Sequence, residues 1–344
     1  MTQARAIRYF ILGLPIGLIV GGIIAMILYF RDEAEASGKI PGHTRREITR
    51  KELEAHVEML SGKIGPRHMG APDALKFTVN YIESTLGPGN LGYRVARHTY
   101  RVGETDCHNL VLDLVAKGSE RVAEIVLVGA HYDTVPSTRG ADDNASGVAA
   151  CMELARAFAN TRQQRSLRFV FFANEEPPYF QTDDMGSLVY AKECKRRGDD
   201  IVAMLSLETL GYYSTEPGSQ KVPPGLEGQV PEKGDFLAVV GNVTSASIVE
   251  IFKNRFAKYS TLPLTGMALP ASVVEQGWSD HWSFWQQGYP AVMVTDTALL
   301  RNPHYHQAGD TAATLDYERF TQAVKGIEGV IEELANPDRV AAGK

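Results

Sequence analysis

Several short segments of this 344-residue chain end apolar stretches in side chains that can bind metal ions or move protons. These residues are His131, Asp133, Asp142, Asp143, Glu175, Glu176, Glu208, His304 and His306. Imidazole nitrogens and carboxylate oxygens, with no thiolate among them, suit zinc or a similar divalent ion. Each segment alone is weak evidence for a metal site, because an H-x-D triplet or an acidic pair also occurs on ordinary protein surfaces. Their recurrence after successive apolar stretches indicates a metal centre.

The stretch FVFFANEEPPYF, residues 169–180, places two glutamates side by side before two prolines. Successive side chains of an extended chain point to opposite sides. We therefore expect Glu175 and Glu176 to do different work, one binding a metal and the other facing the water to be activated. Pro177 favours an extended conformation for Glu176 and opposes a smooth run into a helix. The pattern predicts an extended acidic pair near the mouth of the site.

The elements that would position these residues alternate between strands and helices. Expected strands cover 93–102, 109–116, 124–133, 167–175, 201–211, 236–241 and 291–297, and expected helices cover 49–60, 72–87, 145–159, 185–197, 246–259 and 317–335. This alternation predicts an α/β fold, a three-layer sandwich with a mostly parallel central sheet flanked by helices. Ligands of such sheets bind outside the carboxyl ends of the strands, where the acids and histidines stand.

The motifs H-x-D, G-A-D-D-N-A-S-G, N-E-E, L-E-T-L-G, S-D-H and Y-H-Q-A-G-D-T resemble the M28 family of zinc metallopeptidases in order and approximate spacing. The resemblance covers roughly residues 47–335. It implies a hydrolase that cleaves peptide substrates, most often an aminopeptidase, with two zinc ions per chain. It also implies a cis peptide bond after Asp143.

The resemblance implies a role for each matching residue. The implied metal ligands are His131, Asp143, Glu176, Glu208 and His306, with Asp143 bridging the two ions. Glu175 matches the general base, and Asp133 matches the acid that orients the metal-bound histidine. Asp280 is expected in the hydrogen-bond network around the base, and His281 and Tyr305 are candidates for the pocket wall.

Two of these assignments carry a complication. Glu208 stands where aspartate is commoner in the family, and its extra methylene can change the metal distance. His304 is the rival of His306, and the downstream D-T pair favours His306.

Other activities stay open at this point. A carboxypeptidase of the same family would need a cation for the substrate's carboxylate, and Arg139 is the candidate. A glutaminyl cyclase-like acyltransferase would share the scaffold but hold a single zinc ion. A receptor-like relative without catalysis would lack ligands or the base, whereas this chain has them all.

The amino terminus departs from globular composition, since residues 9–30 carry no charge. About 20 apolar residues span a bilayer as a helix, whereas a signal peptide has a shorter apolar core. We therefore expect an N-terminal tail 1–8, an uncleaved transmembrane anchor 9–30, a linker 31–46, a peptidase domain 47–336 and a tail 337–344. The domain is expected outside the cytoplasm, in the periplasm or at the cell surface, because large domains are exported largely regardless of flanking charge.

Composition argues against nucleic-acid binding, a fully paired disulfide framework and a zinc site made of cysteines. The net charge of −6 gives no indication of nucleic-acid binding, which is usually marked by a basic stripe. The three cysteines, Cys107, Cys151 and Cys194, are odd in number and form no C-x-x-C pair. We expect them to be free and to act as small buried apolar groups.

Overall fold

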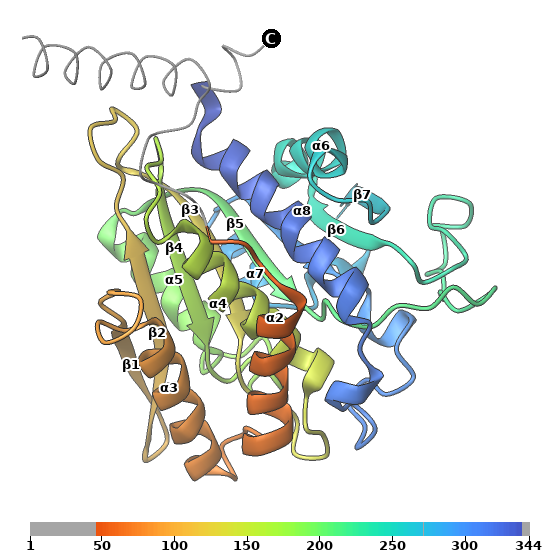
Figure 1. Cartoon of the computed structure of the whole chain (residues 1–344), viewed down its shortest axis with the longest axis horizontal. Coiled ribbons are helices and arrows are strands. Elements are labelled where there is room, and N and C mark those ends of the chain that lie inside the picture. Colours follow the sequence, from red (N-terminus) through yellow and green to blue (C-terminus); the bar gives the residue numbers. More distant parts are fainter. Residues whose placement is uncertain (1–45, 271, 339–344) are drawn as a thin grey trace, which may run out of the picture. The chain divides into compact units, whose positions relative to one another are not determined.

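The structure is a computed structural model that describes residues 46–270 and 272–338 (Figure 1). The expected tail 1–8, the anchor 9–30, the linker except for Arg46, and the end of the chain after residue 338 lie outside the described residues. Within the described ranges, no helix is both long enough and apolar enough to cross a membrane.

The described residues form one eight-stranded sheet with the order β1-β2-β4-β3-β5-β8-β6-β7. The strands are β1 (Ala96–Val102), β2 (Thr105–Leu114), β3 (Glu124–His131), β4 (Ser166–Phe172), β5 (Asp200–Glu208), β6 (Leu237–Asn242), β7 (Leu264–Leu269) and β8 (Ala291–Thr295). The central strands β4, β3, β5 and β8 are parallel, as expected.

Four of the seven strand pairings are parallel, including β6 with β7, and the antiparallel pairings of outer strands make the sheet mixed. β1 pairs with β2 and β2 with β4 in antiparallel fashion, and β6 runs antiparallel to β8. Only Gly103 and Glu104 separate β1 from β2. A link this short makes a hairpin, because a parallel pair needs a crossover of a dozen or more residues.

Helices cover both faces of the sheet (Figure 1). They are α2 (Arg50–Val57), α3 (Pro72–Leu86), α4 (Gly147–Phe158), α5 (Gly186–Arg197), α6 (Ala246–Arg255), α7 (His281–Trp285) and α8 (Tyr317–Ala335). Side chains of alternate residues in β3 pack on opposite faces of the sheet. Val126 and Val128 pack in the core that includes α2, α4 and α8, and Leu127 packs in the core with α5 and α7.

Local sequence signals explain several boundaries. Thr49 caps α2, because its hydroxyl oxygen accepts a hydrogen bond of 3.4 Å from the amide of Glu52. The chain then continues as a wider helical segment, η1 (Glu58–Ile64). Two elements were not predicted: β7, whose residues are mostly half-buried, and the five-residue α7. The three cysteines are free and buried, as expected.

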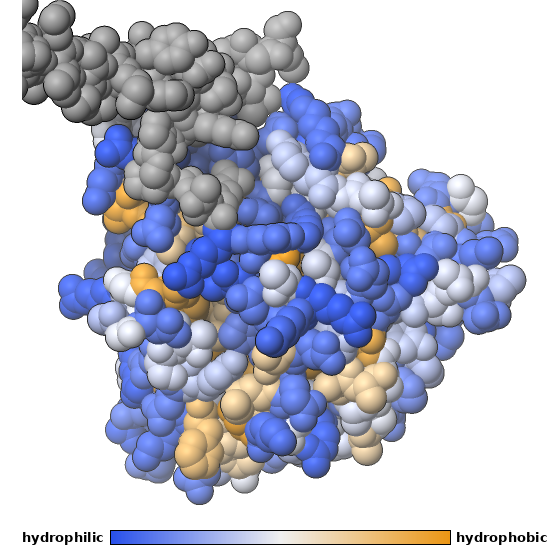
Figure 2. Space-filling view, in the orientation of Figure 1, coloured by the Kyte–Doolittle hydropathy of each residue, from blue (hydrophilic) through white to orange (hydrophobic). Residues whose placement is uncertain are grey.

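The view in Figure 2 shows a largely hydrophilic face, with apolar residues toward its lower part. Exposed large apolar side chains of the described residues include Met59 in η1 and Phe77 in α3. Most other large apolar side chains of the described part lie in the cores on either side of the sheet.

Candidate metal centre

The carboxyl ends of the parallel strands bring the predicted ligands to one edge of the sheet. His131 is the last residue of β3, and Glu208 is the last residue of the neighbouring β5. Glu175 and Glu176 follow β4, which lies on the other side of β3. Asp143 comes from the kinked segment Ala141–Ser146 that leads into α4.

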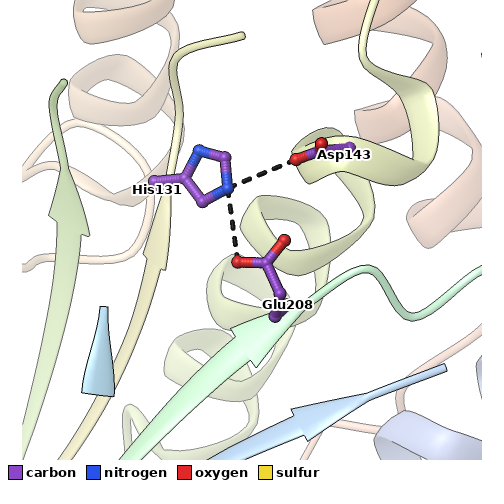
Figure 3. Close-up of side chains that lie close together, drawn as sticks. All are labelled: His131, Asp143 and Glu208. Atoms are coloured by element: carbon purple, nitrogen blue, oxygen red, sulfur yellow. Dashed lines mark ion pairs between the residues drawn. The ribbon is translucent and has the colours of Figure 1, made fainter. Parts of the chain in front are cut away.

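Two groups of three possible ligands share one carboxylate. His131, Asp143 and Glu208 form one group, and Asp143, Glu176 and His306 form the other. His131 Nε2 lies 3.3 Å from Asp143 Oδ1 and 3.3 Å from Glu208 Oε2 (Figure 3). On the other side, His306 Nε2 lies 3.0 Å from Asp143 Oδ2 and 3.2 Å from Glu176 Oε2. Asp143 therefore offers one oxygen to each histidine, as a bridging ligand must.

The donor set fits two divalent cations. The carboxylates of Asp143, Glu176 and Glu208 are almost fully buried together. Glu176 Oε1 is buried without a hydrogen-bond partner among the described residues. Burial raises the pKa of Glu176 to about 7, and the nearby Asp143 adds to the shift. Buried carboxylates that repel one another favour a bound cation, and oxygen with imidazole ligands suits zinc.

Glu175 lies beside the two groups without belonging to either. Its Oε2 is 3.9 Å from His131 Nε2, whereas the carboxylate of Glu176 faces His306. The two adjacent glutamates thus reach different parts of the centre. Burial raises the pKa of the Glu175 carboxyl well above its usual range, although His131 acts against the shift. A buried carboxylate with a raised pKa is suited to accepting a proton at neutral pH.

The strand ends before the acidic pair, whereas the sequence predicted a strand that continues to residue 175. β4 ends at Phe172, and Asn174 has a left-handed φ of 56°. Asp133 then fixes the pair, because its Oδ1 and Oδ2 accept hydrogen bonds of 3.1 Å from the backbone amides of Glu175 and Glu176. The same Oδ1 lies 3.4 Å from His131 Nδ1. Asp133 therefore contacts the predicted base, Glu175, and two predicted ligands, Glu176 and His131, at once.

Asp310 makes a matching arrangement that sequence reasoning missed. Its Oδ1 accepts a hydrogen bond of 2.8 Å from the amide of Asp142, and its Oδ2 accepts one of 3.2 Å from the amide of Asp143. The expected cis peptide is present between Asp143 and Asn144. The only available signal was the G-D-T end of the motif that carries His306, which indicated a register and not a role.

The remaining predicted residues lie close to this centre. Asp280 is fully buried, and neither of its carboxylate oxygens has a hydrogen-bond partner among the described residues. Burial raises its pKa to about 7, with His131 opposing the shift and Glu208 adding to it. The ring of Tyr305 stacks on His306 with centroids 3.9 Å apart. Neither residue belongs to the two ligand groups.

Two histidines are placed outside the ligand groups. His281 bonds through Nε2 to the carbonyl of Gln276 at 2.6 Å and packs edge-on against Trp285. His304 packs edge-on against Tyr212 and belongs to neither group. The structure thus brings His306, and not its rival, to the shared carboxylate.

An apolar cavity opens beside the centre. Glu208 and Tyr305 form part of its wall, and the rest of the lining is mainly apolar. Lining residues include Leu226, Phe236, Met267, Leu269, Met293 and Leu299. A substrate held at the carboxylates can therefore place an apolar side chain in this cavity.

Comparison with known proteins agrees with this geometry. Residues 109–330 match the family described as peptidase family M28. YfbL, an uncharacterized protein of Escherichia coli strain K12, is 34% identical over 314 residues, which cover 89% of this chain and 93% of YfbL. Leucine aminopeptidase 1 of Trichophyton equinum is 29% identical over 243 residues, covering 66% of this chain but only 59% of that enzyme.

A solved structure shares the fold. BSAP, a zinc aminopeptidase from Bacillus subtilis, superposes with a TM-score of 0.66 at 16% identity, covering 86% of this chain and 97% of BSAP. At this identity the likeness establishes the fold alone. The assignment of individual residues still depends on the geometry described above.

Proposed function

Because the chain belongs to peptidase family M28, we propose that it is a zinc-dependent aminopeptidase with a two-metal centre. The observation that carries the proposal is the pair of ligand groups that share Asp143. Zinc aminopeptidases and leucine aminopeptidases among its relatives support the same activity.

The residues divide the work between holding metals and moving protons. His131 and Glu208 would hold one ion, Glu176 and His306 the other, and Asp143 both. When bound, zinc would polarise the scissile carbonyl and make water a better nucleophile. Glu175 would accept the water's proton at Oε2 and deliver it to the leaving amine. Asp133 keeps Glu175 in place through the hydrogen bond to its backbone amide.

The charge around the centre favours a substrate with a free amino terminus over one with a free carboxylate. The nearby carboxylates can attract an α-ammonium group, whereas a carboxypeptidase needs a free cation. Arg139, the candidate cation, donates to the carbonyls of Ser61 and Gly62 at 3.2 and 3.0 Å. The apolar cavity supports a preference for apolar first residues.

Metal content and a substrate panel test this proposal on the purified full-length chain. We expect two zinc ions per chain and cleavage of leucine p-nitroanilide, with no cleavage of its N-acetyl derivative. A single zinc ion with cyclisation of an N-terminal glutamine peptide would identify a cyclase-like enzyme instead. Cleavage of N-blocked peptides from the carboxyl end would identify a carboxypeptidase.

We also propose that residues 9–30 anchor the peptidase domain to a membrane, with the domain outside the cytoplasm. The support is the uncharged stretch of 22 residues from Tyr9 to Phe30.

A further inference from the structure

A buried arginine outside the predicted site touches two of the three segments that carry His131, Asp143 and Glu208, the ligand group of one ion. Arg67 lies between η1 and α3, and it is fully buried. Its Nε donates a hydrogen bond of 2.8 Å to the carbonyl of Tyr132, the residue between His131 and Asp133. Its Nη2 donates one of 2.9 Å to the carbonyl of Gly140, at the start of the segment that carries Asp143.

The same guanidinium ties these two segments to η1. Its Nη1 donates to the carbonyls of Leu60, Gly65 and Arg139 at 3.1, 3.0 and 2.8 Å. All five acceptors are backbone carbonyls, so the planar fork joins three stretches of main chain. A lysine ammonium cannot reproduce this arrangement, because it is a compact group on a flexible stem.

The main chain of Arg67 strengthens the link to the end of β3. Its amide donates to Thr134 Oγ1 at 3.0 Å, and its carbonyl accepts from the amide of Thr134 at 2.8 Å. Thr134 directly follows Asp133, which holds the amides of Glu175 and Glu176. A displacement of Arg67 would therefore also displace residues of both ligand groups.

The contact with Gly140 leaves no spare room. Gly140 has a φ of +58°, and a Cβ there would lie 2.3 Å from the carbonyl oxygen of Asp143 and 3.0 Å from Arg67 Nη2. The backbone of the Asp143 segment thus lies directly against the guanidinium. A shift in the arginine must displace this segment.

Arg67 is also a buried cation next to the acidic centre. Burial lowers its pKa to about 10, and the carboxylates of Asp310, Asp133, Asp143 and Glu176 oppose the shift. The guanidinium therefore stays charged at neutral pH and offsets part of their repulsion. If this charge were the main contribution of Arg67 to zinc binding, a lysine at this position would preserve the zinc affinity.

We infer that Arg67 is a positioning residue for the metal centre, holding the end of β3 and the Asp143 segment at the separation that metal binding requires. This inference rests on the proposed function, since it concerns the same ligands. All hydrogen bonds of the Arg67 guanidinium go to backbone carbonyls, so it would position His131 and Asp143 through the backbone next to them. Outer partners of this kind typically change metal affinity by about 10–100-fold when they are altered.

Zinc affinity of the full-length chain, measured by competition with a chromogenic chelator, tests the inference. We expect Arg67→Lys to weaken zinc binding by about 10–100-fold. Zinc should also raise its Tm less than it raises the wild-type Tm, because the stabilisation by a ligand grows with the logarithm of its concentration divided by Kd. The matched control is Arg168→Lys, a largely buried arginine of β4 that pairs with Asp113 and Asp199. This control should lose stability equally with and without zinc and keep the wild-type affinity.

Each outcome has a separate meaning. An Arg67→Lys protein with wild-type zinc affinity and a full zinc-dependent rise in Tm would leave Arg67 with a structural role only and overturn the inference. A wild-type chain that binds no zinc would overturn the proposed function, and the inference with it. If Arg67→Lys does not fold, the zinc affinity of the Thr134→Val variant tests the inference instead. This substitution removes one backbone link to Arg67 and should weaken zinc binding in the same direction, whereas unchanged affinity would overturn the inference.

Discussion

Ser279 donates a hydrogen bond of 2.7 Å to Glu208 Oε2, the same oxygen that lies 3.3 Å from His131 Nε2. Glu208 is the longer acid at a position where the M28 family more often has aspartate. The hydroxyl removes some of the freedom that the extra methylene adds, because it fixes the oxygen that faces the histidine. Ser279 itself is held by Ser206 at 2.9 Å, so the carboxylate is supported from within the core.

Ser279→Ala should therefore weaken zinc binding at the site of His131 and Glu208 by about tenfold or more. The reason is that Glu208 loses the contact that directs its Oε2. Zinc titration of the metal-free protein measures this change. Ser245→Ala is the control, because Ser245 is equally buried but bonds to Asn242 and Ala291, away from the ligands. Equal zinc affinity in the two variants would show that Glu208 needs no such support.

Glu175→Gln should keep the metal content and lower kcat by about 10²–10⁴-fold, the effect of removing a general base. The amide has nearly the shape of the carboxylate but cannot accept the proton. Turnover of leucine p-nitroanilide and zinc content should be measured on the same sample. Near-normal turnover in a fully metal-loaded variant would assign the base to another residue.

The histidine variants should separate ligands from neighbours. His131→Ala and His306→Ala should each lower zinc content, since each removes one of few protein ligands. His304→Ala should keep two zinc ions, because His304 packs against Tyr212 and lies outside both ligand groups. Elemental analysis after dialysis measures this. Loss of zinc in the His304 variant alone would shift the motif assignment by two residues.

The metal-free protein should lose stability as the pH rises from about 4 to about 7. Burial raises the pKa of Asp280 from 3.8 to about 7. The folded protein therefore holds a proton in this range that the unfolded chain has released, and its stability falls as the pH passes through the folded-state pKa. Each such proton contributes at most about 1.4 kcal/mol per pH unit. The raised pKa of Glu176, also to about 7, acts in the same direction.

Asp280→Asn should reduce this slope, because asparagine does not titrate. Thermal unfolding of chelator-treated protein at several pH values between 4 and 8 measures it. Glu104→Gln is the control for the loss of one carboxylate, because the Glu104 side chain is fully exposed. An identical slope for Asp280→Asn and wild type would mean that Asp280 titrates normally in the folded protein.

The sequence was informative where function depends on residue type. The apolar stretches that form β3 and β5 predicted where His131 and Glu208 would lie, and the motifs named the residues that the structure groups around Asp143. Imidazole and carboxylate groups have few substitutes as ligands of zinc. Their positions in a sequence are therefore readable.

The sequence was silent where residues act through the main chain. The guanidinium of Arg67 donates only to backbone carbonyls, and Asp310 accepts from backbone amides. Any residue type can supply those partners, so no pattern marks the contact. The expected strand ran to residue 175, whereas β4 ends at Phe172 and Asn174 takes a left-handed φ of 56°. Asp133 then accepts hydrogen bonds from the amides of Glu175 and Glu176, which is a main-chain contact that no sequence pattern marks.

The last prediction concerns the membrane. Residues 9–30 are expected to remain attached as an anchor, with the peptidase domain outside the cytoplasm. Arg5 and Arg8 precede the uncharged stretch, whereas Arg31, Lys39, Arg45 and Arg46 follow it. The count of Lys and Arg residues alone would place the domain in the cytoplasm, but large domains cross membranes largely regardless of such charges. Protease added to intact spheroplasts should therefore digest the domain, and the membrane form should begin near Met1. Protection until the membrane is permeabilised would reverse the orientation, and a mature chain beginning after Ser37 would remove the anchor.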